Sequence, residues 1–295
     1  MGVSNVIFGS NPIMDITDST VTPEHVENGY VFYGANGERL IGNMQGGGGE
    51  ELANSYTAVV NNNYRIGGSC AYMFSGNDLF NQPVTIGDNV TSCSTMFNGC
   101  FNFNKPVTIG NNVTNCVAMF YSCWKFNQPI TIPNKVNFCN YMFLDCRVFN
   151  QPITIPDKVL NCAYMFNNCG NFNQPITIPD NVTNCAYMFQ WCYNFNKSVT
   201  IGYNVLTCAY MFNNCRNLNQ NIYIKSTKTS NVVRMLYNHN NQKMINLFCT
   251  NLASLNKTTA ATSLVGAAIT WTAMTNGYYN ATYNVYLYNN LPAGI

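Results

Sequence analysis

Fourteen cysteines are the side chains of this 295-residue chain with the clearest capacity for metal binding or covalent chemistry. Within one repeat two cysteines are seven residues apart, about 10.5 Å on a helix, and a disulfide spans at most roughly 7 Å. Equivalent cysteines of neighbouring repeats would lie about 5 Å apart, which allows a bridge. No alternation in the sequence indicates a pairing. Thirteen cysteines form two series of period 23: Cys70, Cys93, Cys116, Cys139, Cys162, Cys185, Cys208 and Cys100, Cys123, Cys146, Cys169, Cys192, Cys215.

The spacing of these cysteines does not fit a zinc site. Zinc sites use closely spaced C-x2–4-C pairs or cysteine with histidine, and C-x6-C is neither. We interpret the cysteines as small buried hydrophobic residues with reduced thiols. Bridges between repeats and metal binding are the alternatives.

Other catalytic constellations are missing from the sequence. His25 and His239 are far apart, and no HExxH, GxGxxG, P-loop or GxSxG motif is present. Asp88, Asp157 and Asp180 follow predicted strands, but they occupy turn positions, where aspartate is common. We therefore expect no enzymatic activity, no cofactor and no metal.

Composition excludes further classes. Apolar residues make up 47% of the chain and charged residues 9%, against about 25% in an ordinary soluble domain. The net charge is only +2 and the sequence shows no basic face or stripe, so we expect no nucleic-acid binding. No apolar run approaches 18 residues, so we expect no membrane insertion. The N-terminal segment MGVSNVIFGSNP lacks the basic and apolar regions of a signal peptide.

A 23-residue repeat determines the expected fold. In C-x-x-M-F-x-x-C the apolar residues fall at i, i+3, i+4 and i+7, which predicts a helix of two turns. In P-[VI]-T-I, Val84 and Ile86 should point inward and Thr85 outward from a strand that starts after Pro83. Stacked strand–turn–helix units predict an α/β solenoid flanked by small β-hairpin modules.

The first and last repeats are degraded, as a finite solenoid requires. Asn77 replaces the second cysteine of the first repeat. In residues 231–239, Val232 and His239 occupy the two cysteine positions after a one-residue insertion.

The motif V-T-x-C-A-Y-M-F-x-x-C, seen at 182–192, resembles the BspA-like leucine-rich repeats. The resemblance covers about residues 64–250. Cysteine stands for the usual first methionine, and Pro-[VI]-Thr-Ile for the usual Leu-Asp-Leu strand. It implies a leucine-rich-repeat-like array with a role in surface adhesion and no catalytic residues.

Residues 17–44 resemble a small module of phage tail and baseplate proteins. Thr22 is the expected helix N-cap, followed by Pro23, with Gly29 as the stop. Asn36 and Gly37 should form the tight turn of a hairpin between residues 30–33 and 39–44. The resemblance implies attachment to other virion proteins.

The chain divides into four parts. Residues 1–45 are the expected attachment module, 46–50 a glycine hinge, 51–250 the solenoid with its caps, and 251–295 a Thr/Ala-rich segment with a C-terminal hairpin. This hairpin should turn at Asn276-Gly277. Its aromatic residues on both faces indicate a cap, an oligomer contact, or a glycan or receptor contact.

Two constant columns have structural interpretations. An outward threonine column suits a strand, with an ice-binding array as the alternative. It comprises Thr85, Thr108, Thr131, Thr154, Thr177 and Thr200, continued by Tyr223. An asparagine column should satisfy turn backbone groups of the neighbouring repeat. It comprises Asn81, Asn104, Asn127, Asn150, Asn173, Asn196 and Asn219.

The positions that vary most flank the second cysteine and should form one ridge. Because the repeat does not dictate these residues, and because exposed aromatic and arginine side chains are typical binding anchors, they are the candidate ligand-binding residues. Partial burial against neighbours is the alternative. The ridge comprises Phe101, Tyr121, Trp124, Leu144, Arg147, Gln190, Trp191, Tyr193 and Arg216.

These features favour a phage virion protein, either a tail-associated fibre or a capsid-attached protein, whose solenoid binds a host-surface glycan or protein. Residues 1–45 would contact other virion proteins, and a homo-oligomer, by resemblance a trimer, is expected. The expected location is the virion after assembly in the host cytoplasm, with an extracellular location as the alternative. A purely structural decoration protein and a secreted or cell-surface bacterial adhesin are the alternative functions.

Overall fold

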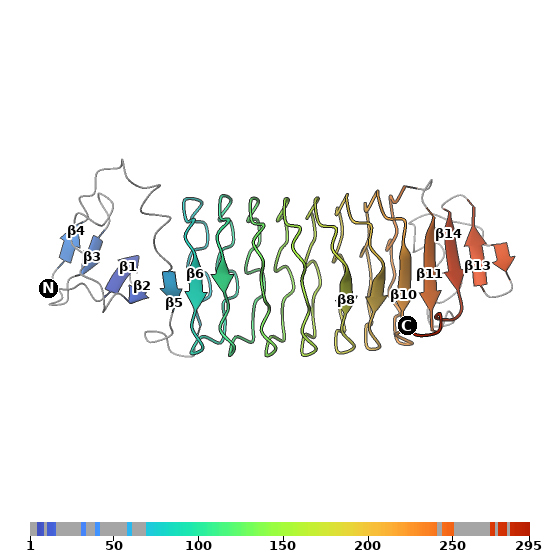
Figure 1. Ribbon diagram of the computed structural model, residues 1–295, viewed down its shortest axis with the longest axis horizontal. Coiled ribbons are helices and arrows are strands. Elements are labelled where there is room, and N and C mark those ends of the chain that lie inside the picture. The colour runs from blue at the N-terminus through green and yellow to red at the C-terminus, as the bar shows by residue number, and fades with distance from the viewer. Residues whose placement is uncertain are drawn as a thin grey trace.

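The repeats stack as successive coils of a parallel β-solenoid (Figure 1). The computed structural model describes residues 69–240, 244–250 and 284–295 continuously, and elsewhere 5–8, 11–15, 31–33, 39–41, 58–60, 272–274 and 277–281. Within these residues all regular elements are strands. We number eight coils in order: 69–91, 92–114, 115–137, 138–160, 161–183, 184–206, 207–230 and 231–240.

Parallel pairing joins the coils along two lines. One is a column of isolated bridges that starts at Ser69↔Ser92 and ends at Thr207↔Asn231. The other is formed by the predicted strands. β6 (Val84–Ile86) pairs with β7 (Val107–Thr108), and β8 (Ile176–Ile178) pairs with β9 (Val199–Ile201).

The predicted inward and outward alternation of these strands is confirmed. Val84 and Ile86 are buried, whereas Thr85 is partly exposed. In coil 4, where no strand is assigned, Ile153 and Ile155 are buried in the same way. The strand motif therefore forms one wall of the core in coils 1 to 7.

The predicted helices are wrong. In coil 5 the segment from Cys162 to Cys169 forms two consecutive turns, with positive φ of 59° at both Tyr164 and Asn168. An α-helix excludes such residues. The amide of Tyr164 donates to Ala186 O of the next coil at 2.9 Å, while that of Met165 donates locally to Cys162 O at 3.2 Å.

The same apolar spacing fits both structures, because two successive turns also direct positions 1, 4, 5 and 8 of C-x-x-M-F-x-x-C inward. A two-turn segment is too short to be stable as a helix by itself. Every second backbone amide of the segment donates its hydrogen bond to a carbonyl oxygen of the next coil, and not to a carbonyl within a helix. The cooperative unit is therefore the stack of coils rather than a local helix.

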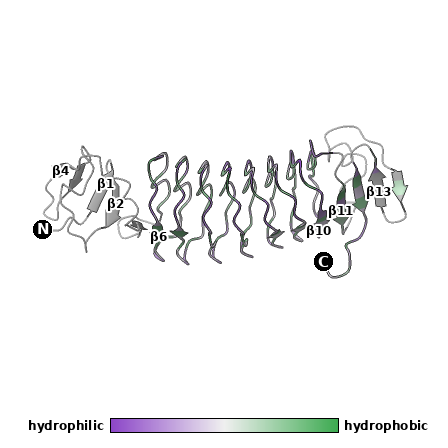
Figure 2. Cartoon of the chain, turned by 45° about the horizontal axis from the view of Figure 1, so that its top comes forward, coloured by the Kyte–Doolittle hydropathy of each residue, from purple (hydrophilic) through white to green (hydrophobic). Residues whose placement is uncertain are grey.

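The core consists largely of two columns of stacked phenylalanine rings. In one column Phe143 lies 5.6 Å from both Phe120 and Phe166, centroid to centroid. In the other, Phe149 lies 5.9 Å from Phe126. Buried cysteine and methionine fill the remaining space. Each coil contains both hydrophobic and hydrophilic segments, and this mixture repeats from coil to coil (Figure 2).

The C-terminal strands extend the solenoid sheet. Its order is β12-β13-β14-β11-β10-β9-β8. The strands not yet defined are β10 (Asn221–Ile224), β11 (Ile245–Cys249), β12 (Thr272–Met274), β13 (Gly277–Asn280) and β14 (Val285–Tyr288).

The predicted C-terminal hairpin is corrected in its turn and in its second strand: Gly277, expected in the turn, is the first residue of β13, and Asn276 lies outside the described residues. β12 pairs with β13 antiparallel, with Met274 opposite Gly277. The expected second strand is split into β13 and β14, which pair with each other. Asn284, at φ 51°, directly precedes β14. Val285 and Leu287 of β14 are buried, so this strand covers the end of the core.

Four N-terminal strands form a separate sheet of order β2-β1-β3-β4. β3 pairs with β4 antiparallel, as the hairpin prediction expects. The predicted helix after Thr22 and the glycine hinge lie outside the described residues. The strands are β1 (Asn5–Phe8), β2 (Asn11–Asp15), β3 (Val31–Tyr33) and β4 (Arg39–Ile41), and β5 (Ala58–Val60) pairs with β6 at the start of the solenoid.

Candidate ligand-binding surface

Three of the predicted ridge residues form one cluster across coils 2, 3 and 4. The Phe101 and Trp124 rings stack with their centroids 4.2 Å apart. The guanidinium carbon of Arg147 lies 4.4 Å from the centroid of the Trp124 ring. These residues occupy the same repeat position in consecutive coils, so the 23-residue spacing itself brings them together. We call them, with Asp145, the Trp124 cluster.

Asp145 holds this cluster in place, and the sequence interpretation missed it. Its carboxylate accepts a hydrogen bond from Trp124 Nε1 at 2.8 Å and forms an ion pair with Arg147 Nε at 3.1 Å. Asn168 Nδ2 of the next coil donates to the same carboxylate at 2.6 Å. The Asp145 side chain is 15% exposed and that of Arg147 54%. One signal was available: Asp145 is the acidic residue that directly precedes a second cysteine.

A second cluster lies in coils 6 and 7. Arg216 places its guanidinium carbon 5.5 Å from the centroid of the Tyr193 ring. Trp191 is 41% exposed and adopts a positive φ of 60°. A bulky residue at positive φ is unusual in a protein backbone. We call Trp191, Tyr193 and Arg216 the Tyr193 cluster.

The ridge is interrupted between the two clusters. In coil 5 the position of Phe101, Trp124 and Arg147 is occupied by Gly170. Gln190, also predicted on the ridge, is partly buried and accepts a hydrogen bond from Asn167 Nδ2 at 2.8 Å. Leu144 is likewise partly buried, whereas Tyr121 is 37% exposed. The ridge therefore presents two aromatic and arginine clusters rather than one continuous strip.

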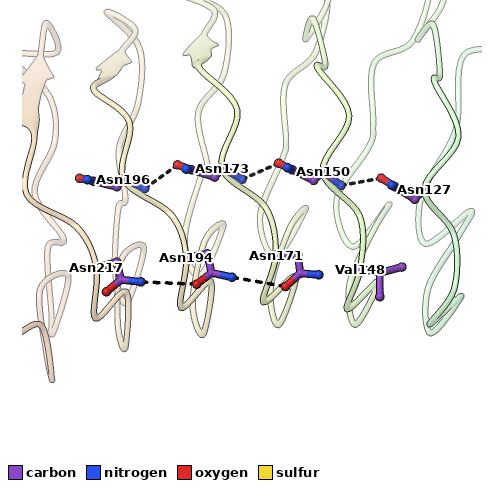
Figure 3. Close-up of a pocket in the computed structure, with 8 residues that line it drawn as sticks. All are labelled: Asn127, Val148, Asn150, Asn171, Asn173, Asn194, Asn196 and Asn217. Atoms are coloured by element: carbon purple, nitrogen blue, oxygen red, sulfur yellow. Dashed lines mark hydrogen bonds between the residues drawn. The ribbon is translucent and has the colours of Figure 1, made fainter.

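Asparagine side chains line an open groove (Figure 3). Several of its residues directly follow ridge positions in the sequence. The groove encloses about 660 Å³ and crosses several coils. Its inner row belongs to the asparagine column, and its outer row directly follows the Gly170, Tyr193 and Arg216 positions. The lining residues are Asn127, Val148, Asn150, Asn171, Asn173, Asn194, Asn196 and Asn217.

The structural role predicted for the asparagine column is confirmed. The backbone amide of each next asparagine donates to the side-chain oxygen of the one before, as from Asn173 to Asn150 Oδ1 at 2.9 Å. The same bond recurs from Asn196 to Asn173 at 2.9 Å. The outer row had no assigned role in the sequence interpretation, although Asn171, Asn194 and Asn217 share its spacing.

The threonine column lies on the outer face of the sheet and is followed by aromatic residues. Tyr223 continues the column, and its ring lies 5.2 Å from Phe248. Phe248 in turn lies 4.6 Å from Tyr288. All three are partly exposed, so they form a second aromatic surface at the C-terminal end.

A tyrosine ladder on the turn side of the coils was also missed. Tyr141, Tyr164, Tyr187 and Tyr210 stack at 4.4 to 4.8 Å between centroids. Partial burial and, next, the adjacent Tyr187 raise the pKa of Tyr164 to about 12. The recurrence of A-Y-M-F and N-Y-M-F at 23-residue spacing could have revealed this ladder.

All fourteen cysteines are buried thiols that form no disulfide. The thiols of the second series donate to a carbonyl of the preceding coil, as from Cys169 Sγ to Phe143 O at 2.9 Å. Burial raises the pKa of Cys100 to about 12 and that of Cys169 well above 9.0. No group of three or more metal-ligating side chains occurs within the described residues. The described part of the chain also contains no helix that is long and apolar enough to cross a bilayer.

The fold and this surface define a repeat solenoid with exposed aromatic clusters. A model of the family DUF285, described as a Mycoplasma protein of unknown function, matches residues 68–177 and 140–252. These matches cover more than half of the chain, so the chain belongs to this family. The match agrees with the BspA-like repeat predicted for residues 64–250.

One solved structure shows similarity at low identity. The crystal structure of a leucine rich cell surface protein from Faecalibacterium prausnitzii matches with 15% sequence identity and a TM-score of 0.37. The match covers 75% of this chain and 76% of that one. A comparison with curated proteins found no match.

Proposed function

We propose that the solenoid is a non-enzymatic binding module that presents its ridge to a glycan or protein on a host or bacterial surface. The observation that carries this proposal is the Trp124 cluster. An exposed indole ring is held between Phe101 and Arg147, and Asp145 fixes both the indole N–H and the guanidinium. Such preorganisation lowers the entropy lost when a ligand binds.

The chemistry of both clusters suits surface ligands. Aromatic rings stack on the apolar faces of sugars, and the planar guanidinium of arginine binds hydroxyl or carboxylate groups. The ridge carries few charges, so binding should depend only weakly on salt. No step in this role needs a catalytic group.

The test compares the ridge with the threonine column. Replacing Trp124, Trp191 and Tyr193 by Ala should reduce binding to target cells roughly tenfold or more, about 1.4 kcal/mol. Replacing Thr131, Thr154 and Thr177 by Val is the matched control and should leave binding unchanged. The opposite pattern would move the site to the sheet. If neither set of variants weakens cell binding, the binding site would be the aromatic surface around Phe248. If the parent protein binds no cells at all, a structural decoration role would be favoured.

The finer proposal is that the protein works in a phage virion, with residues 1–45 as its attachment module. It is supported by the resemblance of residues 17–44 and by the antiparallel pairing of β3 with β4. A fragment that starts at Glu51 should fold and melt cooperatively but fail to incorporate into particles. Normal incorporation would refute the attachment role. Immunoelectron microscopy that finds the protein on cell envelopes instead of virions would favour the adhesin alternative.

A further inference from the structure

The asparagine groove has hydrogen-bonding capacity that the fold does not use. In its inner row each side-chain oxygen accepts the backbone amide of the next coil. Within the described part of the chain, the Nδ2 groups of Asn127, Asn150, Asn173 and Asn196 donate to no protein acceptor. The Oδ1 atoms of Asn173 and Asn196 also accept only that one bond.

The outer row is bound still more loosely. Asn194 Nδ2 donates to Asn171 Oδ1 at 3.3 Å, and Asn217 Nδ2 donates to Asn194 Oδ1 at 3.4 Å (Figure 3). These distances exceed the usual range for N–H···O bonds. All three outer asparagines are exposed, so their amides are free to turn toward a ligand.

The lining residues indicate an uncharged, polar ligand, because they carry no charge and little apolar surface. None of the eight is charged, and Val148 is the single apolar member. The groove therefore offers no counter-charge to an anion or a cation and little apolar surface. Amide N–H and C=O groups together match a hydroxyl group, which both donates and accepts hydrogen bonds.

The spacing of the two rows defines the shape of the ligand. Neighbouring coils of a parallel sheet lie about 4.8 Å apart, whereas an extended polypeptide advances about 3.3 Å per residue and would lose register. An extended chain of equatorially linked pyranose rings advances by nearly one coil per ring. We propose that the groove binds a linear, uncharged polysaccharide along the solenoid axis, with one sugar per coil.

The groove also has a defined length. Its outer row occupies coils 4 to 7, from Val148 to Asn217. In coil 3 the corresponding residue is Lys125, which breaks the run of uncharged side chains. The bound segment is therefore about four sugars long at one sugar per coil.

The test uses the full chain and a panel of neutral linear oligosaccharides of increasing length: β-1,4-linked glucose, mannose, xylose and N-acetylglucosamine. Binding is measured by calorimetry and by the NMR shifts of asparagine side-chain amides. Affinity for at least one series should rise with each sugar and level off at about four. The double variant Asn171→Leu, Asn194→Leu should bind at least about tenfold more weakly.

Two controls separate this groove from the ridge. Asn102→Leu changes the same repeat position in coil 2, outside the groove, and should leave oligosaccharide binding unchanged. Thr154→Val, on the sheet face, should also leave it unchanged, while Trp124→Ala is assessed by cell binding alone, so the two proposals can fail independently. The groove proposal is overturned if no neutral oligosaccharide binds, if the double variant binds like the parent, or if charged polygalacturonate binds more tightly than every neutral chain.

Discussion

The thiol of Cys169 donates to the backbone oxygen of Phe143, one coil earlier, at 2.9 Å. The same oxygen also accepts the amide of Cys146 at 3.0 Å, so both of its lone pairs are used. Equivalent thiol bonds recur from Cys100 to Cys215. The second cysteine of each repeat therefore combines a small apolar side chain with a donor that joins neighbouring coils.

This arrangement predicts unreactive thiols. A thiolate is the reactive form, and burial raises the pKa of these groups well above their ordinary value. A thiol reagent should label few of the fourteen cysteines in the folded protein and nearly all of them after unfolding in denaturant. Mass spectrometry can count the labels. Disulfides between coils in the native protein would contradict the expectation.

The same pKa shifts predict a loss of stability at alkaline pH. Burial disfavours the thiolate and raises the pKa of the Cys100 thiol from its ordinary value of 9.0 to about 12 in the folded chain. Its contribution to stability is complete below pH 9.0 and is lost as the pH rises toward about 12. Denaturant midpoints should therefore fall across this window. Cys100→Ala, which removes one such group, should show a shallower fall.

Strand positions, core residues and the neighbours within each ridge cluster could be predicted from the sequence. The 23-residue period fixes them, since residues such as Trp124 and Arg147 occupy the same position in consecutive coils. The helices could not be excluded, because the apolar spacing from Cys162 to Cys169 fits a helix and a pair of turns equally well. The positive φ of Tyr164 and the hydrogen bonds to the next coil decide between them.

The role of Asp145 was missed for a different reason. It contacts Trp124 and Arg147 from a different repeat position, so the spacing alone does not place them together. The outer asparagine row was visible in the spacing of Asn171, Asn194 and Asn217. It was overlooked because asparagine in this chain was given only the backbone role that the inner row confirms.

Asp145→Asn should weaken ligand binding and cost the fold a modest amount of stability. Asparagine tolerates positive φ, as Asn168 shows at the same position in coil 5. The amide cannot accept from Trp124, Arg147 and Asn168 as the carboxylate does, so the Trp124 cluster loses its fixed geometry. Binding should fall severalfold, while stability falls by about 1 to 2 kcal/mol through the lost hydrogen bonds to the carboxylate. Asp157→Asn, an exposed turn position away from the cluster, should change neither.

Gly110 marks a close approach between coils 2 and 1. A Cβ atom at this position would lie 2.5 Å from the backbone oxygen of Gly87. Gly110→Ala should therefore cost about 1 to 3 kcal/mol through forced displacement of the coil. Chemical denaturation measures this loss. Gly99→Asn is the control, because Asn168 adopts a positive φ at the same repeat position in coil 5 and the atom nearest to a Cβ at Gly99 is 3.7 Å away. A neutral Gly110→Ala would show that the coils separate easily.

Trp191 should be more important for binding than for folding. Its positive φ of 60° costs roughly 1 to 2 kcal/mol for an ordinary residue, and Asn168, Asn214 and Asn238 occupy the same position in other coils. In Trp191→Asn the relief of this strain offsets the loss of the partly buried ring. Stability should change by about 1 kcal/mol or less, whereas cell binding should fall about tenfold.

The matched control for Trp191 lies in the same coil. Tyr187 is also aromatic and also has φ 60°, but it stacks between Tyr164 and Tyr210 in the tyrosine ladder. Tyr187→Asn should lower the melting temperature through lost stacking and leave cell binding unchanged, since its ring packs between two neighbouring tyrosines. A Trp191→Asn variant that loses about 3 kcal/mol or more of stability, as core aromatic truncations do, would give Trp191 a packing role instead. Retained binding would remove it from the ligand surface.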